Sequence, residues 1–330
     1  MTLKSIYDRL NLTPENGLCF IDESNWKNKL SKYTEKVIVE RLKPKSFFCF
    51  DNKPLILFFD SPQNRKELFR DIWNFNEAPI IIINEETTID IYNGFSLDKE
   101  YHDLDKLDDA GNLDNFSYFE LITGKSLEKY TAQFSQKNRI NYNLLRNIKE
   151  ARSILTKYFD LTDYTANALI GRCIFVRYLI DRCVRIDFEN QPRLWTNEDF
   201  CNLLGDQEKT VKFFQHIGSK FNGEAFLISD DELKEVDAGV FKVLKDLLSG
   251  THLSSGQLSL FNIYDFSIIP IEFISNIYEY FIGKENQAKK GAYYTPKFLV
   301  DYILNQTIDK HYNENPDEYN CKILDPACGS

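Results

Sequence analysis

The clearest structural signal in the sequence is the run Lys322-Ile323-Leu324-Asp325-Pro326-Ala327-Cys328-Gly329-Ser330. Its apolar start predicts a short buried strand. An acidic residue follows, and then a turn of small residues, which lets a ligand come close to the backbone. Because α/β sheets bind ligands at the carboxyl ends of their strands, the run predicts the first strand of such a sheet with a binding turn at its tip. The sequence ends in this turn, so we expect most of the associated chemistry to lie beyond Ser330.

The composition is that of a folded protein of two or three domains. Of its 330 residues, 43% are hydrophobic and 14% aromatic, so packed cores are expected. No apolar run approaches the roughly 20 residues of a membrane helix, and Met1 to Ser5 lack the apolar segment of a signal peptide. Seven cysteines without a C-x-x-C pair and four histidines argue against a zinc site or a disulfide framework. We therefore expect a cytoplasmic protein without a membrane partner.

The net charge of −10 argues mildly against a chain that is coated in nucleic acid. It leaves room for a local basic groove. A DNA-reading domain could also lie beyond the part of the protein that this sequence covers.

Residues 1–135 have the pattern of a mixed α/β domain. The apolar runs Phe47–Phe50 and Leu55–Phe59 flank a turn at 51–54 and predict a β-hairpin. Ser61-Pro62 has the signature of a helix start, and this helix is expected to run to about Phe75. The other expected elements are a helix over 24–40, strands over 80–83 and 88–92, the second closed by Asn93-Gly94, and an acidic surface excursion over 98–115.

From residue 136 the pattern changes to helix, and we place a helical domain at 136–285. Apolar spacing predicts helices over 141–159 and 162–184, and capping signatures predict helix starts at Thr196 and Ser229. A loop at 250–256, a short extended piece at 257–261 and a helix over 270–281 follow. Thr295 as N-cap and Pro296 at the first position predict the last helix, before a polar loop at 310–320. The side chains expected to face inward on this helix are Phe298, Leu299, Tyr302 and Ile303.

Two short motifs give the second half of the chain a family resemblance. Gly291-Ala292-Tyr293-Tyr294-Thr295-Pro296 and Asp325-Pro326-Ala327-Cys328-Gly329-Ser330 together resemble the amino-terminal motif and the first cofactor motif of N6-adenine DNA methyltransferases. Their order is that of type I modification subunits and type IIG restriction-modification proteins. The helix at 270–281 and the run Leu169–Arg182 are similar to helices of that group, so the resemblance covers roughly residues 139–330. It implies that residues 286–330 begin a Rossmann-like methyltransferase domain.

The resemblance also implies a site for S-adenosylmethionine that is built from both motifs. The chemistry of the residues agrees with this, because an acid at a strand tip can accept hydrogen bonds from the ammonium group, and small residues leave room for the methionine backbone. A helix N-terminus suits the carboxylate. We interpret Cys328 as a packing residue, since no histidine lies near it in the sequence. The expected cofactor-binding residues are Tyr294, Thr295, Pro296, Asp325, Pro326, Ala327 and Gly329.

The family's (Asn/Asp)-Pro-Pro-(Tyr/Phe) motif, which holds the amino group of the flipped adenine, does not occur in residues 1–330. We therefore expect the catalytic residues beyond Ser330 and no methylation by residues 1–330 alone. For the whole protein, the resemblance implies methyl transfer to adenine in double-stranded DNA, within a restriction-modification or phage-defence system that includes specificity or restriction subunits. Two alternatives stay open: a methyltransferase that acts on RNA or protein, and a non-enzymatic DNA- or subunit-binding module.

The order of elements in residues 1–135 is similar to that of PD-(D/E)xK nucleases, which often accompany type I and type IIG systems. That fold holds Mg²⁺ with an Asp on one strand and a Glu-x-Lys on the next. Asp60 could supply the acid, but Pro62 stands in the place of the lysine, and Phe47–Phe50 contains no acid. Asp51-Asn52-Lys53 lies in a turn, where these residue types are ordinary. An active nuclease with Mg²⁺, an inactive nuclease-like scaffold and an unrelated α/β domain all stay open, and the pattern favours the inactive scaffold over an active enzyme.

Four arginines lie along or just after the helix predicted from residue 162. They either contact DNA phosphates or pair with Asp181, Asp187 and other acids nearby while their stems pack on the core. We favour ion pairing. The arginines are Arg172, Arg177, Arg182 and Arg185.

Overall fold

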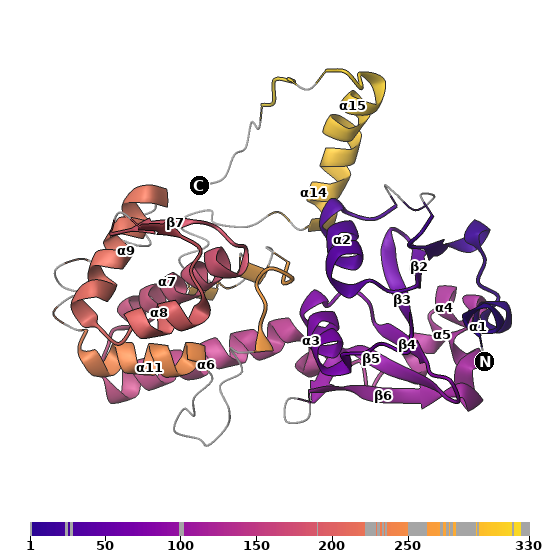
Figure 1. The fold of residues 1–330 in the computed structure, drawn as a ribbon, viewed down its shortest axis with the longest axis horizontal. Coiled ribbons are helices and arrows are strands. Elements are labelled where there is room, and N and C mark those ends of the chain that lie inside the picture. Colours follow the sequence, from indigo (N-terminus) through magenta and orange to yellow (C-terminus); the bar gives the residue numbers. More distant parts are fainter. Residues whose placement is uncertain are drawn as a thin grey trace. The chain divides into compact units, whose positions relative to one another are not determined.

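The computed structural model divides the chain into two compact units, residues 1–270 (unit 1) and residues 271–330 (unit 2) (Figure 1). The domain boundaries predicted after residues 135 and 285 remain predictions. In the part of the chain that the structure describes, no helix is both long and apolar enough to cross a membrane. The described residues are 2–23, 26, 29–98, 102–189, 191–221, 229, 232, 234, 236–249, 263–270, 273–274, 277, 280–281, 295, 297–318 and 320–324.

Unit 1 contains a mixed sheet of six strands that follow one another in sequence order, which confirms the predicted α/β class (Figure 1). β3 and β4 are parallel and joined by α3, and the other neighbouring pairs are antiparallel. The strands are β1 (Leu18–Phe20), β2 (Ser46–Phe50), β3 (Lys53–Asp60), β4 (Ile80–Asn84), β5 (Ile89–Asp98) and β6 (Asp103–Asp109). The helical segments of this part are α1 (Leu3–Leu10), η1 (Pro14–Asn16), α2 (Lys32–Lys36), η2 (Val37–Leu42), α3 (Arg65–Phe75), η3 (Ala110–Phe116), α4 (Tyr118–Ile122), α5 (Lys125–Lys129) and η4 (Gln136–Asn138).

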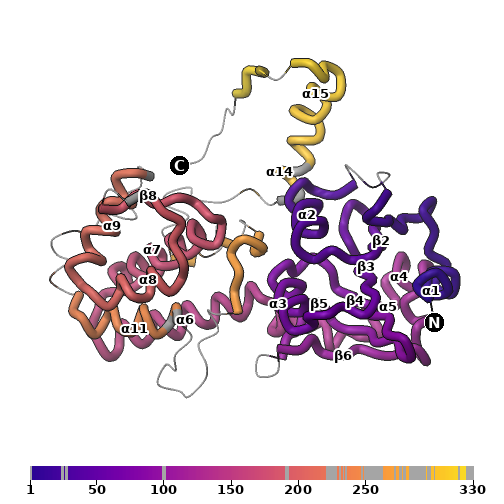
Figure 2. Tube along the Cα trace, in the orientation of Figure 1, coloured from indigo at the N-terminus to yellow at the C-terminus, as the bar shows by residue number. Residues whose placement is uncertain are grey.

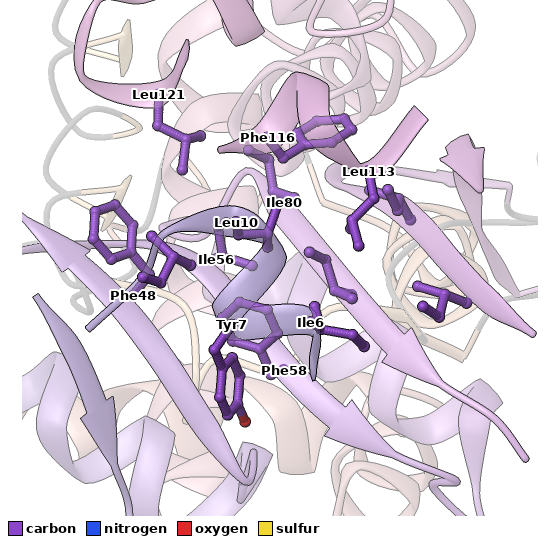
Figure 3. Packing of buried hydrophobic residues seen from close by; sticks show 14 of the residues in the cluster. Ile6, Tyr7, Leu10, Phe48, Ile56, Phe58, Ile80, Leu113, Phe116 and Leu121 are labelled. Carbon is purple, nitrogen blue, oxygen red and sulfur yellow. The ribbon is translucent and has the colours of Figure 1, made fainter. Parts of the chain in front are cut away.

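The four isoleucines of β4 are fully buried because both faces of the sheet are covered. Ile80 and Ile82 belong to a core that includes side chains of α1 and η3 (Figure 3). Side chains alternate along a strand, so Ile81 faces the other side together with its cross-strand partner Tyr92. The ring of Phe69 from α3 lies 5.0 Å from that of Tyr92, which places α3 on this second face.

The predicted β2–β3 hairpin is confirmed, but the predicted start of α3 is wrong. Asp51 and Asn52 form the turn with φ of 50° and 58°, a left-handed backbone that Asp and Asn tolerate. Ser61 does not cap α3, because its N–H donates to the Asn84 carbonyl and prolongs the β3–β4 pairing. The cap is Asn64, whose side chain accepts from a backbone N–H of the first turn.

The dipeptide Asn93-Gly94 does not close β5, contrary to the prediction, and the strand continues to Asp98. A Cβ on Gly94 would lie 2.1 Å from the Ala78 carbonyl oxygen, so glycine is needed here for a close approach of two backbones rather than for a turn. The predicted surface excursion after residue 98 instead contains β6, an edge strand rich in exposed aspartates. Charge on an edge strand opposes pairing with other chains.

The helix predicted over 24–40 is shorter than expected. Its described N-terminal part, at residues 26 and 29–30, is not helical, and α2 begins at Lys32 behind the N-cap Ser31. The helical path then continues through η2 to Leu42 with a wider, π-type turn.

The second part of unit 1 is helical, as predicted. The long helices α6 and α7 match the two predicted from apolar spacing, and Thr162 caps α7. The predicted capping signatures are confirmed too: Thr196 exchanges hydrogen bonds with Asp199, and Ser229 does so with Glu232. The loop and extended piece predicted for 250–261 lie outside the described residues. The elements are α6 (Ile140–Tyr158), α7 (Asp163–Asp181), β7 (Ile186–Phe188), β8 (Gln191–Arg193), α8 (Asn197–Leu203), α9 (Gln207–Phe221) and α11 (Ala238–Ser249).

Residues 263–270, here named the strap, join the two parts of unit 1, and their course can be followed in Figure 2. The ring of Tyr264 stacks on Trp73 of α3, with the centroids 5.7 Å apart and the planes at 19°. Its hydroxyl accepts from Asn147 Nδ2 of α6 at 3.1 Å, and its carbonyl accepts from Arg177 Nη2 of α7 at 3.3 Å. One residue therefore contacts the α/β part and both long helices.

Polar groups of α3 and α7 also fix the backbone of the strap. Asn74 donates to the Ile263 carbonyl and accepts from the Asp265 N–H, both at 2.8 Å. The Asp181 carboxylate accepts from the Phe266 N–H at 3.0 Å. These bonds satisfy strap backbone groups that would otherwise be buried without partners.

The regular secondary structure among the described residues of unit 2 is helical. Residues 273, 274, 277, 280 and 281 are helical, as predicted for 270–281. The last helix runs through α14 (Lys297–Leu304), η7 (Asn305–Asp309) and α15 (Lys310–Glu314), so the loop predicted from residue 310 is partly wrong. No Gly or Pro interrupts the sequence between Lys297 and Asn315, and the helix stops one residue before Pro316.

Truncating Tyr264 is expected to destabilise unit 1 strongly. Tyr264→Ala removes a buried aromatic ring and should lower the free energy of unfolding by about 3–5 kcal/mol. Tyr264→Phe keeps the ring, removes the hydroxyl that accepts from Asn147, and should cost about 1 kcal/mol. Urea denaturation of the full chain measures both. The exposed Tyr158→Ala is the control, with an expected change within about 0.5 kcal/mol, and an equally small effect of Tyr264→Ala would contradict the role of the strap.

Candidate functional site

Of the seven predicted cofactor-binding residues, the structure describes Thr295. It is exposed, and the described part of α14 begins two residues later, at Lys297. Its hydroxyl is therefore accessible at the N-terminal end of a helix. The other predicted residues lie outside the described part of the chain: Tyr294, Pro296, Asp325, Pro326, Ala327 and Gly329. The S-adenosylmethionine site and the capping role of Thr295 stay predictions.

The apolar residues of α14 do not face inward, contrary to the prediction. Tyr302 is 62% exposed, Ile303 48% and Leu299 40%, while the Phe298 side chain lies outside the described part. The described residues of unit 2 provide no second apolar layer to cover this helix. Helical spacing predicted the helix correctly, but spacing alone does not tell which surface covers an apolar face.

The strand predicted at the start of the Lys322–Ser330 run is also absent from its described residues. Ile323 and Leu324 are 68% and 86% exposed and have no strand partner. A strand needs a hydrogen-bonding neighbour, and none of the described residues in unit 2 forms one. Cys321 keeps this run near α15, since its Sγ lies 3.7 Å from the Tyr312 hydroxyl. Unit 2 thus exposes a set of large apolar side chains of the kind that mark an interaction surface.

The candidate acid of the nuclease-like part is hydrogen-bonded to an amide side chain of the neighbouring strand β4. Asp60 is exposed at the end of β3, where its Oδ1 accepts from Asn84 Nδ2 at 2.7 Å. The neighbouring strand β2 begins with the buried Ser46, whose hydroxyl lies 2.6 Å from that of Tyr7. Burial, and to a smaller extent the charge of Asp60, raise the pKa of Tyr7, so this hydroxyl stays neutral.

Mg²⁺ catalysis of phosphodiester cleavage requires several oxygen ligands from the protein. No cluster of three or more His, Cys, Asp or Glu side chains suited to a metal ion occurs among the residues that the structure describes. The nuclease-like assignment itself stays a prediction.

The ion-pair interpretation is confirmed for two of the four arginines. Arg172 is buried and binds Glu232 through two hydrogen bonds of 3.0 and 3.3 Å, so its partner is neither of the aspartates that the sequence offered. Arg177 pairs with Asp181 at 2.7 Å. The guanidinium of Arg182 lies over the ring of Tyr178, 4.6 Å from its centroid. Both of these ion pairs are largely buried.

The strap is the part of this region that the sequence did not reveal. A signal existed, because Ile263-Tyr264-Asp265-Phe266 places two aromatic residues and an acid just before Pro270. Nothing local predicts their partners, since Trp73 and Asn74 are about 190 positions away.

Comparison with known families gives one match in this region. Residues 270–330 match the model of the N-6 DNA Methylase family. Comparison with curated proteins and with solved structures finds no match. The matched segment begins at Pro270, where the strap ends, and contains all seven predicted cofactor-binding residues. It supports an N6 DNA methyltransferase family, and with it a methyltransferase class, for this segment of the chain.

We expect no nuclease activity from the amino-terminal part. The chain should not nick supercoiled plasmid in MgCl₂, because Pro62 stands in the place of the motif's lysine and the described residues contain no group of three or more side chains suited to a metal ion. Asp60→Ala should then match the parent in a gel assay of plasmid relaxation. Nicking that requires magnesium and disappears in Asp60→Ala would show that the site is active.

Proposed function

We propose that this chain is the amino-terminal portion of a site-specific DNA adenine-N6 methyltransferase of a type I or type IIG restriction-modification or related phage-defence system. The observation that carries the proposal is the match of residues 270–330 to the N-6 DNA Methylase family, over a segment that includes both cofactor motifs. S-adenosylmethionine would supply the methyl group and double-stranded DNA the adenine. Specificity or restriction subunits would be partners of the whole protein.

The residues of this chain would bind the cofactor rather than carry out the transfer. Asp325 would accept hydrogen bonds from the cofactor's ammonium group, and Ala327 and Gly329 would leave room for its methionine end. The exposed Thr295 would line the same end from the start of α14. The adenine pocket would be supplied by residues beyond Ser330.

The exposed apolar side chains of unit 2 support this assignment. The exposed side chains of Leu299, Tyr302 and Ile303 in α14, and of Leu324, are costly to leave in water, at roughly 25 cal/mol per Å² of apolar surface. Further α/β units of a methyltransferase domain would cover α14 and pair with the 322–324 run. The predicted strand would then form once a neighbouring strand is present.

Methyl transfer by a chain extended through the complete methyltransferase domain tests the proposal. With isotopically labelled S-adenosylmethionine, the label is expected in adenine of duplex DNA. Asp325→Ala should weaken cofactor binding about 10- to 100-fold, since hydrogen bonds to charged groups contribute about 1.5–3 kcal/mol. Calorimetry measures this loss, and Asp317→Ala, an exposed acid in the same unit, is the matched control with unchanged affinity.

Three results would contradict the proposal. Label in RNA or protein rather than DNA would favour a methyltransferase of another substrate class. Failure of the extended chain to bind S-adenosylmethionine would favour a non-enzymatic binding module. Equal cofactor affinity of Asp325→Ala and Asp317→Ala would remove the assigned role of Asp325.

A further inference from the structure

Helix α6 carries a row of cations along its solvent side. Leu144 and Ile148 are buried and define the side that faces the core. Arg146, Lys149 and Lys157 are exposed, and at about 100° per residue they fall within an arc of about 80° opposite the buried side. These three residues are named the basic stripe.

A polar pocket lies at the N-terminal end of the basic stripe. Its volume is about 370 Å³, and its lining includes Lys137, Tyr142 and Arg146. Tyr142 is 44% exposed, so its hydroxyl is available as a donor. Asp105 of β6 lies on the opposite wall, where it accepts from the Ser96 hydroxyl. The pocket therefore presents two cations and a phenol on the side of α6, and a carboxylate on the side of the sheet.

Residues 135–158, which contain η4 and α6, carry a net positive charge, whereas the whole chain carries a net negative charge. Acids outnumber Lys and Arg by 50 to 40 in the whole sequence, whereas residues 135–158 contain six Lys or Arg and the single acid Glu150. One of the six, Arg152, pairs with Asp163 at 2.6 Å and lies outside the basic stripe. A concentration of cations on one exposed face of an otherwise acidic protein fits an anionic partner.

The dimensions of the basic stripe fit a nucleic-acid backbone. From Arg146 to Lys157 the helix rises about 16 Å, at about 1.5 Å per residue. Duplex DNA carries one negative charge per about 1.7 Å of its axis, so a surface of this length lies along several phosphates. Lys, Arg and Tyr side chains are common donors to phosphate oxygens.

We propose that the basic stripe, together with the pocket at its N-terminal end, contacts the phosphate backbone of double-stranded DNA. The inference rests on the proposed methyltransferase function and adds the surface that holds its substrate. The exposed Asp105 of β6 lines the pocket, so the duplex extends from the pocket toward Lys157 and away from this carboxylate. Because phosphate contacts carry no sequence information, the contribution is independent of DNA sequence.

The salt dependence of DNA binding tests this surface. The full chain is titrated with a fluorescent duplex of arbitrary sequence at increasing NaCl concentrations. The triple variant Arg146→Gln, Lys149→Gln and Lys157→Gln should bind more weakly, and the slope of log K against log salt should fall by up to about 2.7, at about 0.9 per phosphate contact. The matched control removes the same charge from exposed lysines of α9 and α11, by Lys209→Gln, Lys212→Gln and Lys242→Gln, and should keep the parent slope.

The outcomes separate this surface from the proposed function. If the two triple variants have equal salt slopes and the circular dichroism of the parent, the basic stripe does not contact DNA. The proposed function is then still tested separately, by methyl transfer with the extended chain. Absence of duplex binding by the parent at low salt would overturn the surface too. Stripe-dependent binding that is tighter for single-stranded RNA than for duplex DNA would assign the surface to another partner.

Discussion

Tyr264 holds unit 1 together, because its ring stacks on Trp73 of the α/β part while its polar groups accept from Asn147 and Arg177 of the helical part. Burial raises the pKa of its hydroxyl, which therefore stays neutral and keeps its hydrogen bond. The buried ring contributes packing energy, and the hydrogen bonds to the strap backbone depend on its orientation. Together they favour a single position of the strap. Both parts belong to unit 1, and the domain boundary predicted after residue 135 stays a prediction.

Charged side chains around the strap also favour one position of the strap over others. Burial raises the pKa of Asp181, opposed by the adjacent Arg177, and this carboxylate accepts from the Phe266 N–H. Asp265 in the strap binds Arg41 at 2.9 Å, which also contacts Asp71 of α3. Such pairs contribute little net stability, but an unpaired partner would be costly, so they favour one arrangement over others. Pro270, the last residue of the strap, is also the first residue of the segment that matches the N-6 DNA Methylase family.

The sequence predicted elements well where the determining interactions are local. The hairpin at Asp51-Asn52, the ends of α6 and the capping box at Thr196 follow from turn chemistry, apolar spacing and caps. The sequence predictions failed where a backbone group far away along the chain determines the structure. Gly94 resembles a turn residue, but the close approach of the Ala78 carbonyl requires a glycine there. Ser61-Pro62 looks like a helix start, but β4 captures its N–H.

Predictions for the candidate site also fail where contacts with distant parts of the protein determine the structure. Its motifs are recognisable in the sequence because small residues and a helix start are local features. The burial of α14 and of the 322–324 run depends on covering surfaces that the described residues do not include, so the inward orientation predicted for Tyr302 and Ile303 is wrong. The buried partner of Arg172 could not be read from spacing either, since Glu232 is 60 positions away.

An experimental structure of a chain extended through the complete methyltransferase domain, with S-adenosylmethionine bound, tests the central claim most directly. The account predicts that the Asp325 carboxylate lies within hydrogen-bonding distance of the cofactor's ammonium group. It also predicts that Leu299, Tyr302 and Ile303 become buried and that residues 322–324 pair as a strand. A cofactor bound elsewhere, with α14 still exposed, would contradict the assignment of residues 270–330 as the start of a DNA adenine methyltransferase domain.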